Sequence, residues 1–212
     1  MEEGSERMGK TVAAGNHGRA ENEGVARNLD EVKEAVDDAS RNFDIWWVYR
    51  AKGSHEQYVD VLNQYPLFFE TAIHAHFVAL FIALYRVFET RPDTMNVSGV
   101  LGLLQRHLSG QEKHQVDDLI KKAKPLWVKV AIVRSEVFAH RSKTLTVEKS
   151  LDKAKLSPNE LRELIGLCKK IVNCLSHSFD RSSFAFPDAE GDTRRLLDVL
   201  KGYKPRRLQQ RD

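Results

Sequence analysis

The residues of this chain with the clearest chemical potential lie in one short segment, Arg134-Ser-Glu-Val-Phe-Ala-His140. An arginine keeps its charge at any accessible pH, and its planar guanidinium can hold a phosphate through two parallel hydrogen bonds. A histidine has a pKa near neutrality, so it can accept a proton from one group and return it to another. The segment therefore combines a residue type that binds phosphate with one that transfers protons.

The apolar residues around Arg134 predict a helix from Pro125 to about Arg141. On a helical wheel of about 100° per residue, Arg134 falls between two apolar rows, so we expect it inside an apolar stripe. A buried charge must be paired or must serve a ligand. The alternative to a ligand site is a core arginine paired with a carboxylate of a neighbouring helix. The two rows consist of Leu126, Val130, Val133 and Val137, and of Trp127, Ala131 and Phe138.

His140 lies about 120° from Arg134 on the same wheel. Two side chains so placed cannot reach one phosphate from one regular helix. Either the helix unwinds near its end, or two chains face each other and combine their residues. The alternative for His140 is an ion pair with Glu136, four residues earlier.

The segment Arg134-Ser-Glu-Val-Phe-Ala-His140-Arg141 resembles the motif of the HEPN superfamily, an arginine followed by four to six residues and a histidine. The sequence Phe138-Ala-His140-Arg141-Ser-Lys-Thr is most similar to the AbiU-type branch, which is associated with abortive phage infection. The order of features from about residue 29 to 200 also resembles that branch: a long apolar helix, a short leucine-rich helix, the motif helix, a polar loop and another helix.

This resemblance implies an all-α, HEPN-like fold and a metal-independent endoribonuclease, or ribonuclease-like toxin, in phage defence. His140 would be the acid/base group and Arg134 the phosphate binder, with Ser135, Glu136 and Arg141 in support. In this family two motifs from two chains meet at a dimer interface, which implies a homodimer. RNA would be the substrate and a protein antitoxin a further partner; neither a cofactor nor a metal is expected.

A different class of function stays open: a non-catalytic HEPN module that binds nucleotide, RNA or a partner protein. Active members of the superfamily usually carry a polar residue, often Asn, directly after the arginine, and here that residue is Ser135. A serine hydroxyl cannot donate and accept as an amide does. Ser135 therefore favours this alternative.

A basic cluster, Lys121-Lys122-Ala-Lys124, precedes the motif helix. Such a run is usually a solvated helix face. If the chain binds RNA, the three lysines would help to hold its phosphates.

The composition favours long helices, since only 6 prolines and 12 glycines occur in 212 residues, of which 42% are hydrophobic. We see no convincing strand and predict an all-α bundle of five to seven helices. We expect a disordered segment over 1–27, the helical domain over 28–203 and a basic tail over 204–212. The net charge of +3 is too small to indicate a nucleic-acid partner by itself.

Local signals predict where several helices begin and end. Capping boxes at Ser109-Gly-Gln-Glu112 and Ser157-Pro-Asn-Glu160 each predict a helix start. We expect Pro125 to interrupt the helix that begins near residue 110. The stretch from Leu67 to about Thr90 is apolar on nearly all sides, which predicts a helix buried on all sides. A polar loop is expected from Ser142 to Leu156.

Two features bear on the location of the protein. Cys168 and Cys174 would lie about 120° apart on a helix, so we expect two reduced thiols and a cytoplasmic protein. The first 28 residues contain no apolar stretch, so we expect no signal peptide. The most apolar run, 77–84, falls short of the ~20 residues of a membrane span, so no membrane association is expected.

Overall fold

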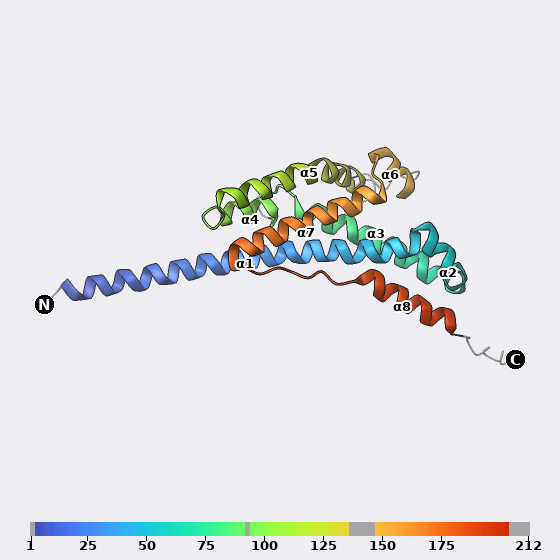
Figure 1. Ribbon diagram of the computed structural model, residues 1–212, viewed down its shortest axis with the longest axis horizontal. Coiled ribbons are helices and arrows are strands. Elements are labelled where there is room, and N and C mark those ends of the chain that lie inside the picture. The colour runs from blue at the N-terminus through green and yellow to red at the C-terminus, as the bar shows by residue number, and fades with distance from the viewer. Residues whose placement is uncertain (1–2, 92–93, 136–146, 204–212) are drawn as a thin grey trace. The chain divides into compact units, whose positions relative to one another are not determined.

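The computed structural model is all-α, as predicted (Figure 1). It describes residues 3–91, 94–135 and 147–203, the side chains of 3–21 and 147–150 excepted. These residues form eight helices, against the five to seven expected, and no strand. The helices are α1 (Glu3–Arg50), α2 (Lys52–Gln64), α3 (Pro66–Val87), α4 (Val97–Leu104), α5 (Gly110–Arg134), α6 (Val147–Ala154), α7 (Pro158–Asp180) and α8 (Ala189–Gly202).

The chain divides into two compact units. Unit 1 comprises residues 1–36 and 84–184, and unit 2 comprises residues 37–83 and 185–212. The motif helix α5 belongs to unit 1.

Unit 1 is built around the pair α5 and α7, with α4 packed on α7 and α6 packed on α5 (Figure 1). The two long helices run antiparallel, because the late α5 residue Lys129 contacts the early α7 residue Glu160. At the other end, Glu112 of early α5 lies near Arg181, just beyond α7. The interior is apolar and includes these buried residues of α5 and α7: Val116, Ala123, Val130, Val133, Leu161, Leu164, Cys168, Ile171, Val172 and Leu175.

The two predicted capping boxes are confirmed at the starts of α5 and α7. The prediction that Pro125 interrupts the helix is wrong, since α5 runs through it. Proline removes one backbone hydrogen bond. The apolar face continues on both sides of it with the buried residues Ala123 and Val130, and their burial offsets that loss.

The first helix begins much earlier than predicted. Residues 1–27 were expected to be disordered, whereas α1 starts at Glu3 and its first described buried side chain is Val25. Val25 and Leu29, each 1% exposed, continue the apolar row of the later turns, and an existing helix extends at little cost once nucleated. The expected loop over 142–156 also contains a short helix, α6.

Helix α3 is not buried on all sides, contrary to the prediction. Leu67 is 79% exposed, Phe68 65% and Ile82 49%. The buried positions Phe77, Leu80 and Phe81 form only part of its surface, since an apolar composition does not dictate how many neighbours a helix has. Among the described residues, α3 alone is long and apolar enough for a membrane span by length and composition, criteria that core helices of soluble proteins also meet.

Unit 2 has its own apolar core, which includes the buried side chains Val48, Tyr49, Tyr58, Val61, Leu62, Phe69 and Leu197. Helices α2 and α8 pack together in it. The Tyr58 hydroxyl donates a hydrogen bond of 3.0 Å to Asp198, and burial is the main cause that raises the pKa of Tyr58. Trp46 of α1 is 4% exposed, and its ring contacts that of Phe77 of α3.

Candidate functional site

Arg134, the predicted phosphate binder, is the last residue of α5 and is exposed. Its guanidinium carbon lies 4.3 Å from the centre of the Tyr85 ring of α3. The prediction that Arg134 lies buried within an apolar stripe is therefore wrong, and the described residues provide no carboxylate for it. The neighbouring Val130 and Val133 are fully buried, so Arg134 reaches solvent because its long side chain extends past them.

An aromatic cluster fixes the ring beneath the guanidinium. Tyr85 stacks on Trp127 of α5, with ring centres 5.7 Å apart and planes 26° apart. The Trp127 indole N–H donates to the Tyr85 carbonyl at 3.4 Å, and the Phe88 ring packs edge-on against Trp127 with ring centres 6.3 Å apart. A cation over an aromatic face is attracted by the ring quadrupole, so Tyr85 orients the guanidinium while its exposed N–H groups stay available to a ligand.

The remainder of the predicted motif is only partly described. Ser135 is exposed and follows the last residue of α5, and its backbone N–H donates to the carbonyls of Ala131 and Ile132. Glu136, His140 and Arg141 lie outside the described residues, so the structure does not show whether His140 approaches Arg134.

A second cation near this end of α5, Lys129, has a structural role. Lys129 Nζ lies 2.5 Å from Glu160 Oε1 and 2.7 Å from the Lys155 carbonyl. The hydrogen bond from Lys129 is the largest cause that lowers the pKa of Glu160 to about 2, followed by the backbone N–H of Ser157. Lys129 therefore ties the beginning of α7 to the motif helix and does not serve a ligand.

The three predicted RNA-binding lysines are all exposed but do not share one face of α5. On the wheel, Lys121 and Lys124 lie about 60° apart, and Lys122 is about 100° from the nearer of them. Lys121 is also 3.6 Å from Asp118. Only Lys122 points toward the side of α5 that faces α7.

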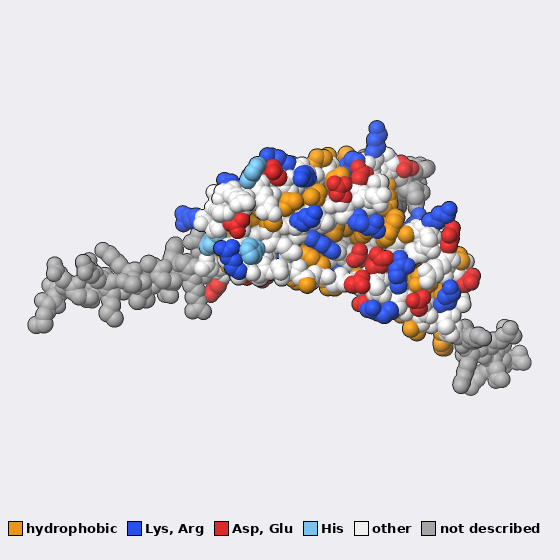
Figure 2. All heavy atoms as spheres, viewed as in Figure 1, with side chains coloured by type: hydrophobic (Ala, Val, Ile, Leu, Met, Phe, Trp, Pro, Cys, Tyr) orange, Lys and Arg blue, Asp and Glu red, His pale blue; other side chains and the backbone are white. Residues whose placement is uncertain are grey.

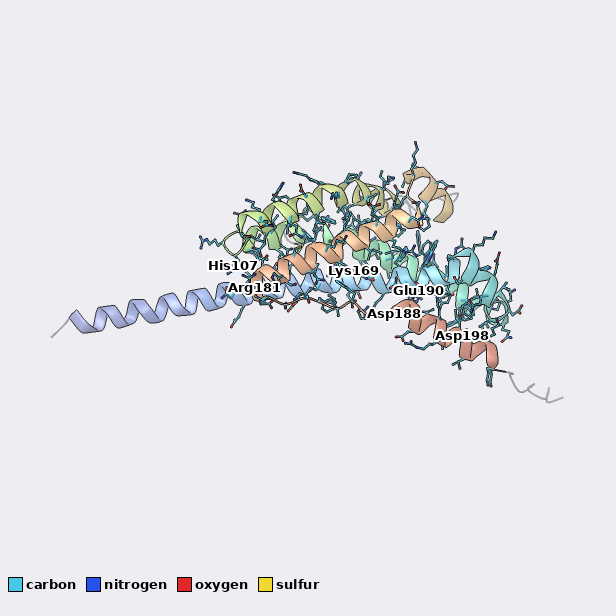
Figure 3. All side chains as sticks on the ribbon, in the orientation of Figure 1. His107, Lys169, Arg181, Asp188, Glu190 and Asp198 are labelled. Carbon is cyan, nitrogen blue, oxygen red and sulfur yellow. The ribbon has the colours of Figure 1, made fainter. Side chains whose placement is uncertain are left out.

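That side borders a groove of about 440 Å³ between α5 and α7, which the sequence did not predict. Figure 2 shows basic side chains interspersed with hydrophobic ones over these two helices, and Figure 3 labels Lys169 on α7 and Arg181 at its end. The sequence does contain one signal for this groove: the spacing of Lys170, Asn173 and His177 places all three on one face of α7. The groove is lined by Glu112, Gln115, Leu119, Lys169, Lys170, Asn173, Cys174 and His177.

In comparison with protein-family models, residues 23–199 match the HEPN family described as AbiU2. The matched range includes the described part of the motif and both sides of the groove. No curated protein and no solved structure matches the chain.

Proposed function

The chain belongs to the AbiU2 family of HEPN domains, and from this premise we propose that it is a metal-independent endoribonuclease acting as a toxin in phage defence. The observation that carries the proposal is the exposed guanidinium of Arg134, which Tyr85 orients and which the described residues leave without a carboxylate. A fixed, solvent-facing guanidinium is suited to a phosphate.

In the proposed reaction Arg134 binds the non-bridging oxygens of the scissile phosphate and stabilises the charge that grows on them. His140 accepts the proton of the adjacent 2′-hydroxyl, whose oxygen then bonds to phosphorus. The bond from phosphorus to the 5′-oxygen breaks, and that oxygen takes up a proton, leaving a 2′,3′-cyclic phosphate. Ser135 and Arg141 hold the phosphate in place, and Glu136 orients His140.

We further propose that the active form is a homodimer. On a regular helix Arg134 and His140 diverge by about 120°, so Arg134 of one chain and His140 of the other would complete each site. The exposed apolar residues Val128 (48%) and Ile132 (40%), one turn apart on α5, offer an apolar surface for a contact between chains, although they lie about 120–160° around the helix from Arg134. The cytoplasm is the proposed location, supported by the two free cysteines, and an antitoxin protein is the proposed partner of the toxin.

The second candidate function is a non-catalytic HEPN module that binds RNA, nucleotide or a partner protein. Ser135 favours it, because the exposed serine directly after Arg134 cannot replace an amide that donates and accepts at once.

The test is cleavage of varied RNAs by the purified protein in the presence of a chelator. Arg134→Ala and His140→Ala are each expected to reduce cleavage by about 100-fold or more, whereas the exposed Arg106→Ala is expected to leave it unchanged. Inactive wild-type protein would contradict the enzyme and support the binding module.

A mixture of the two inactive variants tests the shared site. If each site combines Arg134 of one chain with His140 of the other, mixed dimers contain one intact site and activity returns. A mixture as inactive as its components would contradict the shared site and indicate that both residues act within one chain.

A further inference from the structure

Helix α8 carries an exposed apolar stripe, formed by Leu196, Val199 and Tyr203. Leu196 is 54% exposed and Val199 70%, and Tyr203, which directly follows the helix, is 57% exposed. On the wheel Leu196 and Val199 lie about 60° apart, but they lie about 100° and 160° from Leu197, which is fully buried in the core of unit 2. The stripe is therefore on a different side of α8 from the one that packs on its own unit.

The other side of α8 is fastened to α2. The Tyr58 hydroxyl donates at 3.0 Å to Asp198, which Figure 3 labels, and Lys201 Nζ donates to the Gln57 carbonyl at 3.1 Å. Because these bonds and the buried Leu197 hold the helix, the stripe is not needed to keep α8 in place. A single exposed apolar residue is ordinary, but several aligned on one side of a helix indicate a contact surface.

Basic residues follow the stripe directly along the chain. The segment 204–212, which lies outside the described residues, contains four basic residues and one acidic residue: Lys204, Arg206, Arg207, Arg211 and Asp212. On the helix beside the stripe, Asp192 forms an ion pair with Arg195, so this pair adds no net charge. An exposed apolar surface thus leads into a strongly basic segment.

We propose that α8 and the basic segment after it bind reversibly to the surface of an anionic lipid membrane. The stripe would enter the interfacial region, and the basic side chains would contact the lipid phosphates. An exposed apolar helix face together with a basic cluster is the combination that binds peripheral helices to anionic lipids. Tyrosine is enriched at the membrane interface, which suits Tyr203. Such binding takes place at the surface and is distinct from a span of the bilayer.

The form of the stripe favours a lipid surface over an acidic segment of another protein. The stripe is the convex face of one helix, and a protein partner would need a complementary groove to receive it. A lipid interface needs no preformed shape. A nucleic acid would contact the basic segment through its phosphates, but it would not use the aliphatic side chains of Leu196 and Val199.

The experiment is co-sedimentation of the full-length protein with lipid vesicles. Phosphatidylcholine vesicles are compared with vesicles that also contain about 30% phosphatidylglycerol, and only the anionic ones are expected to bind, less strongly as salt increases. The Arg206→Gln/Arg207→Gln variant is expected to bind them about 10-fold more weakly, because each basic residue near the surface contributes. The Leu196→Ser/Val199→Ser variant is expected to bind at least about 5-fold more weakly, because it loses apolar area.

The controls change the same residue types elsewhere. Arg106→Gln/Lys113→Gln removes the same charge, and Met95→Ser/Leu103→Ser removes two apolar side chains. All four residues are exposed and belong to unit 1. Both controls are expected to bind the anionic vesicles as the wild type does, and thermal unfolding shows whether each variant is folded.

Equal binding to the two kinds of vesicle, or equal weakening by the controls, overturns the proposal. If the arginine variant binds more weakly but the folded Leu196→Ser/Val199→Ser variant does not, the basic segment binds by charge alone. That outcome rejects a lipid surface and favours an acidic protein or a nucleic acid as the partner. The proposal does not depend on RNA cleavage, so a protein without ribonuclease activity would leave these outcomes unaffected.

Discussion

The α5–α7 pair carries a capping box at each end, and the two boxes are locally alike. In each, the serine N–H donates to the glutamate Oε2 at 2.8 Å, and the glutamate N–H donates to the serine Oγ at 3.2 Å. The boxes differ in the cation that approaches the glutamate. Glu160 of α7 is approached by Lys129 of α5, and Glu112 of α5 by Arg181, just beyond α7. Lys129 lies 2.5 Å from Glu160, whereas Arg181 lies 3.8 Å from Glu112.

The difference shows that one sequence motif can serve two purposes, depending on what the neighbouring helix supplies. At the Glu160 end both ionic side chains are 29% exposed, and the pair fastens α7 to the motif helix five residues before Arg134. At the Glu112 end Arg181 is 74% exposed, and the box forms one side of the open groove. A fixed framework suits a catalytic arginine, and an open groove suits a ligand that must enter and leave.

The largest expected effect is the loss of stability in Glu160→Gln. The variant loses the ion pair with Lys129 and weakens the cap of α7, so we expect the free energy of unfolding to fall by about 1–2 kcal/mol at pH 7. Urea unfolding measures it, with the exposed Glu163→Gln of the same helix as control.

The difference between wild type and Glu160→Gln should depend on pH. The pKa of Glu160 is lowered to about 2 in the folded state, so its contribution is fully present above the ordinary value near 4.5. That contribution is lost as the pH falls from about 4.5 through about 2. A difference between the two proteins that stays constant from pH 7 to pH 3 would show that the ionised carboxylate is not what stabilises this end.

A smaller effect is expected from the ring beneath Arg134. Tyr85→Leu removes the cation–π contact, worth about 0.5–1 kcal/mol at an exposed site, so RNA cleavage should fall about 3-fold. Tyr85→Phe keeps the ring and should retain the wild-type rate. A Phe variant as slow as the Leu variant would assign the effect to the hydroxyl group, and equal rates for all three proteins would mean that the ring does not position Arg134.

The sequence predicted those features that are set by local chemistry. The all-α fold and both capping boxes follow from short-range spacing and apolar patterns. The passage of α5 through Pro125 was missed, because burial on both sides of a proline can outweigh its cost.

The sequence did not predict the exposure of Arg134 or the existence of the groove, for a different reason. A helical wheel gives the direction of a side chain but not its depth, and a long arginine can pass over apolar neighbours to reach solvent. The groove needs residues from two helices about 50 positions apart, and their pairing is not encoded in either segment alone. The position of His140 relative to Arg134 remains a prediction from the sequence, because His140 lies outside the described residues.

The smallest expected effect belongs to the second capping box. Glu112→Gln keeps a side chain that can still accept the Ser109 N–H, and the partner it loses, Arg181, is distant and mostly exposed. Exposed pairs of this kind contribute little, so the midpoint of urea unfolding should shift less than in Glu160→Gln. A loss of stability equal to that of Glu160→Gln would show that the distant Arg181 stabilises its box as much as Lys129 stabilises the other.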